Sequence, residues 1–547
     1  MRTIKDILSV ILLLFGIGWS LWFVFAGFGN PQDPLYWLYK YQTLECGWMA
    51  IGTILTGGAL VRLFGANLLM LRLAAWVTVA GAIVLPYCCL LTKEQRRNNI
   101  HWLALAFAFM NYGAFQEFSS GTLTVLILSA IWVCAVQRPT TNDKRQILSA
   151  VLAGLAVTIR FPNILVLLIL IPLWKKRSLW LVPIAALSAG LVYLLGYALI
   201  TPVSMDPAMG SHGVGEMISA LWDRGSVLLL YLLMWGGVMA IGRFSNDQRQ
   251  TTNDHGSADR QKLPIAAGVI VGALLSYYVS RAIPTWKWYN MDLTYLISAM
   301  ILVLAFGNIQ RLTTNDQRPI TNYQLPIGAL LLMIATLGTD TAWLKLFPAV
   351  LCLLPVAAVQ YEASMRQYLF PVLLILAVTV MIRFSINSVG SSNLRVSNTP
   401  SQVAPYTHIR ITEKEEAWMQ QVLADYSSLN DQMVNDQMVN DQMVNDQMVN
   451  VLAVGRNMHL MRAITGCEAA VYNEFWSNIF DSVYTTKYEQ IIEAQHPIVF
   501  CSFAPNFKKE TDRDTESCLE NMLRAHGYHE IDRSDYKYMI YIPTTND

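Results

Sequence analysis

The sequence predicts an all-α polytopic membrane domain with about thirteen transmembrane helices, followed by a C-terminal α/β domain. The first observation is composition: of 547 residues, 54% are hydrophobic and 14% charged, and the mean hydropathy is +0.37. These values lie outside the range of soluble globular proteins. The second is that apolar stretches of transmembrane length recur up to residue 387, where the chain becomes polar. The net charge of +1 and the lack of a Lys/Arg-rich block give no sign of nucleic-acid binding.

Basic clusters between the apolar stretches set the expected topology. Arg2 and Lys5 precede the first span, 6–27, and hold the N-terminus inside. That span has no small-residue cleavage site and is expected to remain in the protein. A long outer loop, 28–66, follows it. The other spans are expected near 67–92, 101–116, 121–137, two short arms within 147–174, 178–201, 226–243, 263–283, 291–309, 325–339, 346–361 and 368–386.

The two short arms are predicted from a break at Arg160-Phe161-Pro162-Asn163. Proline disfavours a straight helix, and basic residues flank both ends of the 147–174 stretch, so a hairpin is expected. With thirteen spans and the N-terminus inside, the C-terminus lies outside. Lys and Arg are roughly twice as frequent in the proposed inner segments as in the outer loops, which favours this orientation.

The polar remainder divides into a linker, 388–450, and a small domain, 451–547, that follow the membrane domain 1–387. The linker contains an expected amphipathic helix near 411–429 and four tandem copies of Asn-Asp-Gln-Met-Val from Asn430 to Val449, interpreted as a surface linker. The domain is predicted α/β from strand-like runs at 451–454, 468–472, 497–502 and 538–542 and helical patterns at 476–494 and 514–526. A disulfide in an oxidising compartment would have to be chosen among Cys46, Cys467, Cys501 and Cys518, whose pairing the sequence leaves open.

The first outer loop carries the residues that point to chemistry. Asp33 follows the first span directly, so its carboxylate is expected at the membrane surface. Tyr36 begins an aromatic run, and Gly47-Trp48 closes it. An aspartate before Pro34 could also serve as a helix N-cap, which is the structural alternative to a chemical role.

Three matches in order along the chain resemble the GT-C type polyprenyl-phosphate-dependent membrane glycosyltransferases, in particular the aminoarabinose transferase and protein O-mannosyltransferase-like group. The resemblance is clearest over residues 1–175. Its motifs are Asp33 with Tyr36 and Gly47-Trp48, then Arg62-Leu63-Phe64-Gly65-Ala66-Asn67 with Leu71-Arg72-Leu73, and then the segment from Ala153 to Arg160.

The resemblance implies that Asp33 is a catalytic carboxylate, and the chemistry agrees. Sugar transfer from a lipid phosphate needs a base for the acceptor hydroxyl. The leaving phosphate is stable as an anion, so one carboxylate and nearby cations suffice, unlike the carboxylate pair of glycosidases. The family usually has an aspartate entering the fourth span, where this chain has Gly121. Glu117 is the candidate to stand in for it, and a divalent cation stays open as a cofactor.

Outward-facing cations are the candidates for the donor phosphate. The topology places Arg160, Arg281 and Lys287 near or within the outer membrane surface, where an unpaired charge usually marks a function. Snorkelling to lipid headgroups is the alternative for each. Tyr36 and Trp286 could stack on a sugar or belong to the aromatic belt. His212 and Glu216 could pair on a metal, although a solvated loop is the plainer interpretation.

These observations predict a bacterial inner-membrane glycosyltransferase. It would use a polyprenyl-phosphate sugar donor and a lipid, glycan or protein acceptor of the cell envelope, on the periplasmic face and with inversion. A transporter or flippase of lipid-linked glycans would instead be expected to show repeated halves and mid-span charges. A polysaccharide polymerase or ligase would place its main charged loop later in the chain. The sugar, the acceptor and the oligomeric state are not readable from the sequence.

Overall fold

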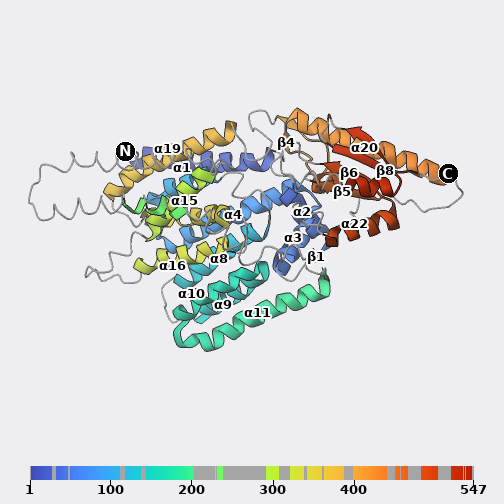
Figure 1. Cartoon of the computed structure of the whole chain (residues 1–547). Coiled ribbons are helices and arrows are strands. Elements are labelled where there is room, and N and C mark those ends of the chain that lie inside the picture. The colour runs from blue at the N-terminus through green and yellow to red at the C-terminus, as the bar shows by residue number, and fades with distance from the viewer. Residues whose placement is uncertain are drawn as a thin grey trace, which may run out of the picture.

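The computed structural model describes residues 2–27, 32–46, 50–110, 118–136, 143–202, 228–229, 231–233, 235–237, 291–306, 321–337, 342–359, 363–386, 398–439, 450–455, 458–465, 482–502, 519–533, 535 and 538–544. These form a bundle of apolar helices and, beside it, a smaller domain built on a four-stranded sheet (Figure 1). The protein is therefore mostly helical with a small sheet.

Three helices in the described ranges are long and apolar enough to cross a membrane: α1 (Arg2–Phe25, from Asp6), α4 (Leu68–Leu90) and α11 (Ser178–Leu199). Other helices of the described residues complete the bundle, and the predicted number of thirteen spans stays a prediction. They are α3 (Ile51–Phe64), α6 (Ile100–Phe109), α8 (Ser120–Val136), α9 (Asp143–Ile159), α10 (Val166–Trp174), α15 (Met291–Phe306), α16 (Thr321–Met333), α17 (Ala342–Leu351), α18 (Leu354–Val359) and α19 (Ala363–Ile386).

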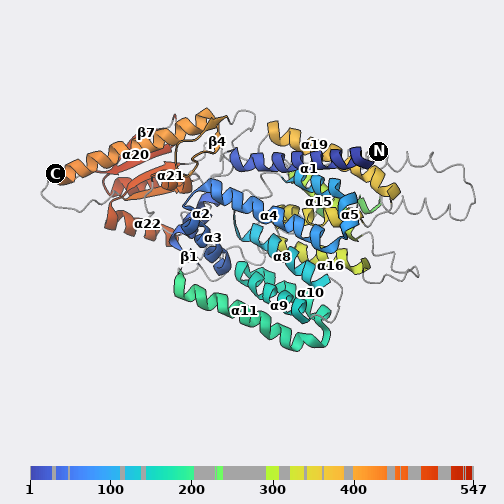
Figure 2. The same cartoon turned by 180° about the vertical axis from the view of Figure 1, so that it is seen from behind.

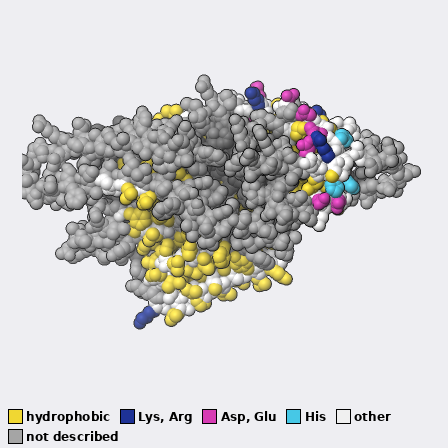
Figure 3. Space-filling view, in the orientation of Figure 1, with side chains coloured by type: hydrophobic (Ala, Val, Ile, Leu, Met, Phe, Trp, Pro, Cys, Tyr) yellow, Lys and Arg dark blue, Asp and Glu magenta, His cyan; other side chains and the backbone are white. Residues whose placement is uncertain are grey.

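Exposed apolar side chains gather on the outside of this bundle. Figure 3 shows a broad hydrophobic area over its lower part, where Figure 1 places α11. Leu179, Leu187 and Leu194 on α11 are more than half exposed. An apolar area of this kind fits contact with lipid, because leucines at this exposure in water would be unfavourable.

The two ends of the bundle differ in what they contact. At one end, α5 (Lys93–Asn98) brings Arg97 to Asp6, near the start of α1, with an ion pair of 3.2 Å. At the other end, the amide of Gly27, just beyond α1, donates to the carbonyl of Arg410 at 2.8 Å. Figure 2 shows α5 near the N-terminus and the sheet domain at the far side. We call these the α5 end and, after the helix described below, the α2 end.

The predicted hairpin within 147–174 is confirmed. The α9 helix ends at Ile159, Arg160 is extended, and a 3-10 turn, η2 (Phe161–Leu165), leads into α10. Pro162 would clash with the carbonyl four residues earlier in a continued helix, which explains the break. The end of α10 lies beside the first half of α9, as shown by the hydrogen bond of 3.1 Å that the Trp174 indole donates to the Ser149 hydroxyl.

The C-terminal domain has a sheet of order β5-β6-β8-β7, in which β5 (Val451–Gly455) and β6 (Ile498–Ser502) are parallel and β8 (Tyr538–Pro543) is antiparallel to both β6 and β7 (Tyr528–Arg533). Strand β7 was not predicted, since its run Tyr-His-Glu-Ile-Asp-Arg is mostly polar, as suits an edge strand. The predicted strand 468–472 lies outside the described residues. Cys501 is buried in β6, and the side chains of Cys46, Cys467 and Cys518 are not described, so the disulfide stays a prediction.

Helices cover both faces of this sheet. Tyr488 and Ile492 of α22 (Ser482–Gln495) pack with Leu523 on one face. On the other face, α21 (Met458–Thr465) and α20 (Glu413–Val439) join a core that is continuous with that of the bundle. Because α20 runs through Val439, the first two Asn-Asp-Gln-Met-Val copies of the predicted surface linker are helical.

A buried carboxylate fixes α20 to the sheet. Asp425 accepts hydrogen bonds from Arg533 at 2.9 and 3.0 Å, from the Tyr538 hydroxyl at 2.6 Å and from Gln421 at 3.0 Å. Burial alone would raise the pKa of this carboxyl, but these hydrogen bonds and the charge of Arg533 hold it below its usual value. The segment before residue 430 thus belongs structurally with the sheet domain.

Candidate functional site

The predicted outer loop 28–66 contains a helix that lies between the bundle and the sheet domain. Helix α2 (Gln32–Thr43) carries Asp33 in its first turn, where Pro34 is tolerated because the amide at that position has no intrahelical partner. The backbone of Asp33 is described, whereas its side chain is not. The place of Asp33 in the molecule is therefore given by the rest of α2.

Tyr41 connects α2 to the turn that precedes α8. Its hydroxyl donates to the carbonyl of Phe118 at 2.5 Å, and its ring is fully buried. A β-carbon at Gly57 of α3 would overlap this ring, so the close approach of α2 and α3 requires glycine there. Phe118 directly follows Glu117, and Tyr41 lies about 12 Å along the helix axis from Asp33 at 1.5 Å per residue. The helix that carries Asp33 therefore contacts Phe118, the residue that follows Glu117 in the sequence, at the α2 end.

Helix α3 contacts both α2 and the residue before Arg160. The Thr53 hydroxyl donates to the carbonyl of Ile159 at 3.0 Å, one residue before Arg160. Asn163 fixes the following turn, because its amide donates to the Thr124 hydroxyl at 3.0 Å and to the carbonyl of Ala156 at 2.9 Å. The break in the α9–α10 hairpin is thus held rigidly against α3 and α8.

Arg160 itself is 8% exposed and donates to the carbonyl of Ala335, in the 3-10 turn η6 (Ile334–Thr336), at 3.0 Å. Within the described parts of the chain this is the single hydrogen bond of its side chain, although a guanidinium has five N–H donors. A buried cation with unused donors at the end of apolar helices is costly, and such residues usually bind something. The planar donor fork is suited to a phosphate.

A second cation lies nearby that sequence reasoning missed. A β-carbon built on Gly121, in the first turn of α8, would lie 3.3 Å from Cδ and 3.4 Å from Nζ of Lys345 on α17. Both α8 and α17 pack against η6, the turn that accepts from Arg160. Lys345 therefore stands beside the position where the resemblance leads one to expect an aspartate. The sequence signal that could have identified Lys345 is its position as a lone lysine at the start of an apolar helix.

The aromatic run of α2 has neighbours within the protein. The Lys40 ammonium lies 5.4 Å from the ring centroid of Tyr36 and 5.8 Å from that of Tyr39. The Tyr39 hydroxyl donates to Glu45 at 3.1 Å, and the Arg462 guanidinium of α21 lies 3.2 Å from the Tyr39 centroid. The sheet domain thus contacts the helix that carries Asp33. Tyr36, predicted to bind substrate, is partly exposed on this helix.

Arg72, which belongs to the motif at the start of the second span, fixes the other approach to α2. Its guanidinium donates to the carbonyl of Gly27 at 2.9 Å and lies 5.8 Å from the Tyr406 ring centroid. Gly27 is the last described residue before α2. A structural role in holding the end of α1 accounts for the buried charge of Arg72.

The structure thus places Arg160 and Tyr36 among the predicted site residues, and the backbone of Asp33. Other predicted residues lie outside the described ranges, and their roles stay predictions: Glu117, Arg281, Lys287, Trp286, His212 and Glu216.

Comparison with solved structures finds ArnT, an aminoarabinose transferase of the GT-C type, from Cupriavidus metallidurans. Its apo structure is 11% identical, with a TM-score of 0.40, over 98% of this chain and 98% of that chain. Its structure bound to undecaprenyl phosphate is 11% identical, with a TM-score of 0.39, over 100% and 99%. No protein-family model and no curated protein sequence matches. At this level of likeness, function has to be inferred from the residues of this chain.

Proposed function

We propose that this protein is an inverting membrane glycosyltransferase that moves a sugar from a polyprenyl-phosphate donor to a cell-envelope acceptor. It would act at the periplasmic face of a bacterial inner membrane, with the α5 end in the cytoplasm, where the positive-inside rule puts Lys93, Arg96 and Arg97. The observation that carries this proposal is the hydrogen bond from Tyr41 to Phe118, because it joins the helix that carries Asp33 to the residue that follows Glu117 in the sequence.

The reaction is a single displacement. The Asp33 carboxylate takes the proton of the acceptor hydroxyl as its oxygen attacks the anomeric carbon, and the bond from that carbon to the phosphate oxygen breaks. The electron pair leaves with the lipid phosphate. Attack from the opposite side inverts the anomeric configuration.

The leaving phosphate is bound by cations. Arg160 makes a single side-chain hydrogen bond to the residues that the structure describes, and Lys345 adds a positive charge near η6. Arg281 and Lys287 are further candidates from the topology. Glu117 would replace the aspartate that the resemblance leads one to expect at Gly121, and its carboxylate is the candidate ligand if a divalent cation takes part. Tyr36 and Trp286 are proposed to contact the sugar. Undecaprenyl phosphate, the lipid in one ArnT structure, is the carrier to test first.

Mass spectrometry of envelope lipids and glycans in a deletion strain tests the proposal. The strain should lack one sugar, and the wild-type gene should restore it. Asp33→Asn should insert normally into the membrane and fail to restore the sugar. Asp6→Asn, a matched change at the α5 end, should restore it fully. Full restoration by Asp33→Asn would refute the proposed base.

A further inference from the structure

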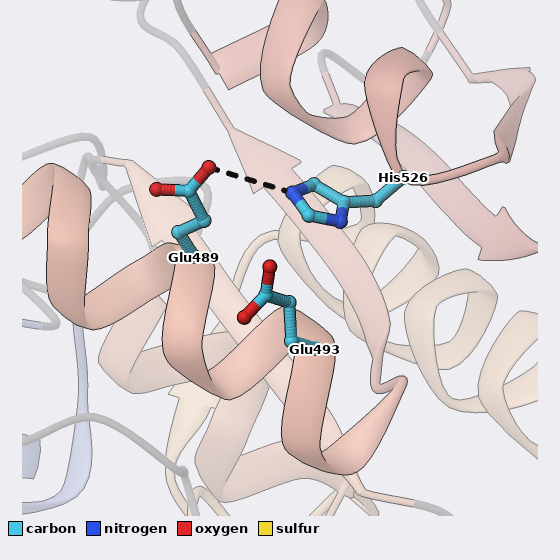
Figure 4. A group of neighbouring side chains, drawn as sticks. All are labelled: Glu489, Glu493 and His526. Carbon is cyan, nitrogen blue, oxygen red and sulfur yellow. Dashed lines mark ion pairs between the residues drawn. The ribbon is translucent and has the colours of Figure 1, made fainter.

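Three side chains with metal-ligand chemistry converge on the sheet domain, far in sequence from the proposed transfer site. Glu489 and Glu493 lie one turn apart on α22, and His526 comes from the turn after the helical residues 519–525 (Figure 4). One ligand atom from each lies within 4.8 Å of the other two. The His526 Nε2 and a Glu489 carboxylate oxygen are 3.6 Å apart.

The fold holds these positions in place. Tyr488 and Ile492 of α22 are buried against the sheet, which turns the adjacent Glu489 and Glu493 outward. The backbone amide of His526 donates to the carbonyls of Met522 and Leu523 at 3.1 and 3.2 Å.

The turn after His526 is also fixed. Gly527 has a φ of +76°, and its carbonyl accepts from the Thr544 amide at 2.8 Å. The histidine backbone is therefore rigid, while the two exposed glutamates can adjust by side-chain rotation.

The charges of the group favour a cation. Two carboxylates at i and i+4 repel each other on a helix. The nearby Arg524 is engaged elsewhere, with Glu520 and, at 3.7 Å, with Glu530. Among the described side chains, no lysine or arginine pairs with Glu489 or Glu493. Two carboxylates thus lie beside the imidazole of His526, and no other basic side chain among the described residues pairs with them.

We propose that Glu489, Glu493 and His526 bind a divalent transition-metal ion of the zinc class. Zinc takes imidazole nitrogen at about 2.0–2.1 Å and carboxylate oxygen at about 2.0–2.2 Å, and three protein ligands leave one position for water. Calcium and magnesium prefer oxygen ligands throughout, so the imidazole favours zinc or nickel. The ion would connect α22 to the turn that leads into β7. This site lies on the sheet face opposite α20 and α21, so it is independent of the proposed transfer reaction.

Zinc titration of the purified full-length protein, stripped with a chelator, tests the site. The measurement is the number of Zn²⁺ equivalents bound, since other cysteines and histidines of the chain could also take up the ion. His526→Gln and Glu493→Gln should each bind one equivalent fewer than the wild type. Glu520→Gln, a nearby carboxylate outside the group, should bind the wild-type number.

Thermal unfolding gives a second readout. Zn²⁺ should raise the melting temperature of the wild type and of Glu520→Gln more than that of His526→Gln, provided circular dichroism shows each variant folded. If either ligand variant does not fold, the other decides the test. Equal stoichiometry in all folded variants would overturn the proposal, as would a wild type that binds no zinc. A pH-dependent stability without zinc uptake would instead assign the group to a protonated His526 and also overturn it.

Discussion

Two buried charges, one in each part of the molecule, have opposite surroundings. Asp425 in the sheet domain is 7% exposed and accepts from Arg533, Tyr538 and Gln421. Arg160 in the bundle is 8% exposed and donates to one carbonyl within the described residues, that of Ala335. At nearly equal burial, Asp425 is paired by three side chains and Arg160 by one backbone carbonyl within the described residues, which is why we assign Asp425 to the fold and propose a ligand for Arg160.

The energetics of burial explain why this difference is informative. A buried ion is stabilised only when its hydrogen-bonding capacity is used, and removing one partner of such a pair is strongly destabilising. Asp425 satisfies that condition with groups of its own chain. Arg160 makes one side-chain hydrogen bond to the described residues, which leaves the other donors of its guanidinium for the lipid phosphate that we propose it binds.

The largest expected effect is at Arg160. Arg160→Gln should lower sugar transfer about 10- to 100-fold, because charge-assisted hydrogen bonds to a phosphate contribute about 1.5–3 kcal/mol. Glutamine is polar and uncharged, so the variant buries no unpaired charge and the protein should fold. The readout is the restored sugar per inserted molecule. Arg177→Gln, an exposed change beside Gln146, is the matched control. Unchanged transfer by Arg160→Gln would assign Arg160 to structure alone.

Asp425→Asn should lower the stability of the protein and leave sugar transfer per folded molecule unchanged. Loss of the charged acceptor should destabilise the sheet domain by about 2 kcal/mol, since buried donors lose a charged partner. Transfer per folded molecule should stay near the wild-type rate. Urea unfolding followed by tryptophan fluorescence gives the stability, with the exposed Asp431→Asn on the same helix as control. A stability equal to the wild type would mean that the Asp425 pairing contributes nothing.

The pH dependence of stability gives a third test. Because the folded pKa of Asp425 lies below its usual value, the carboxylate stabilises the fold above the unfolded pKa, near 3.9. This contribution is lost as the pH falls through the folded pKa. The stability difference between wild type and Asp425→Asn should therefore be constant from neutral pH to about pH 5 and shrink below pH 4. Unfolding curves at several pH values measure it, and a difference that grows on acidification would contradict it.

The smallest expected effect is where the two parts of the molecule meet. Arg462→Ala removes the guanidinium from the Tyr39 ring, an interaction of about 0.5–1 kcal/mol. Transfer should fall about fivefold through a less fixed α2, and Arg462→Lys should keep most of the activity. Tyr39→Phe retains the ring and should change little. A full loss with Arg462→Ala would show that the domain contact does more than position α2.

Local sequence patterns predicted much of the fold but few of the tertiary contacts that bring the candidate site residues together. Pro162 was enough to predict the break beside Arg160, and the apolar runs predicted the helical bundle. Strand β7 escaped prediction because an edge strand can be polar. The contact of Tyr41 with Phe118 joins residues 77 positions apart, and Lys345 meets Gly121 only through the packing of α8 and α17. Neither contact leaves a periodic pattern in the sequence.

The most direct measurement is the binding of undecaprenyl phosphate to the purified protein in lipid nanodiscs, followed by native mass spectrometry. Wild type and Asp425→Asn should bind one molecule saturably, and Arg160→Gln should bind about 10- to 100-fold more weakly. Equal binding by Arg160→Gln and wild type, or no binding by either, would contradict the assignment of Arg160 as the residue that holds the lipid phosphate.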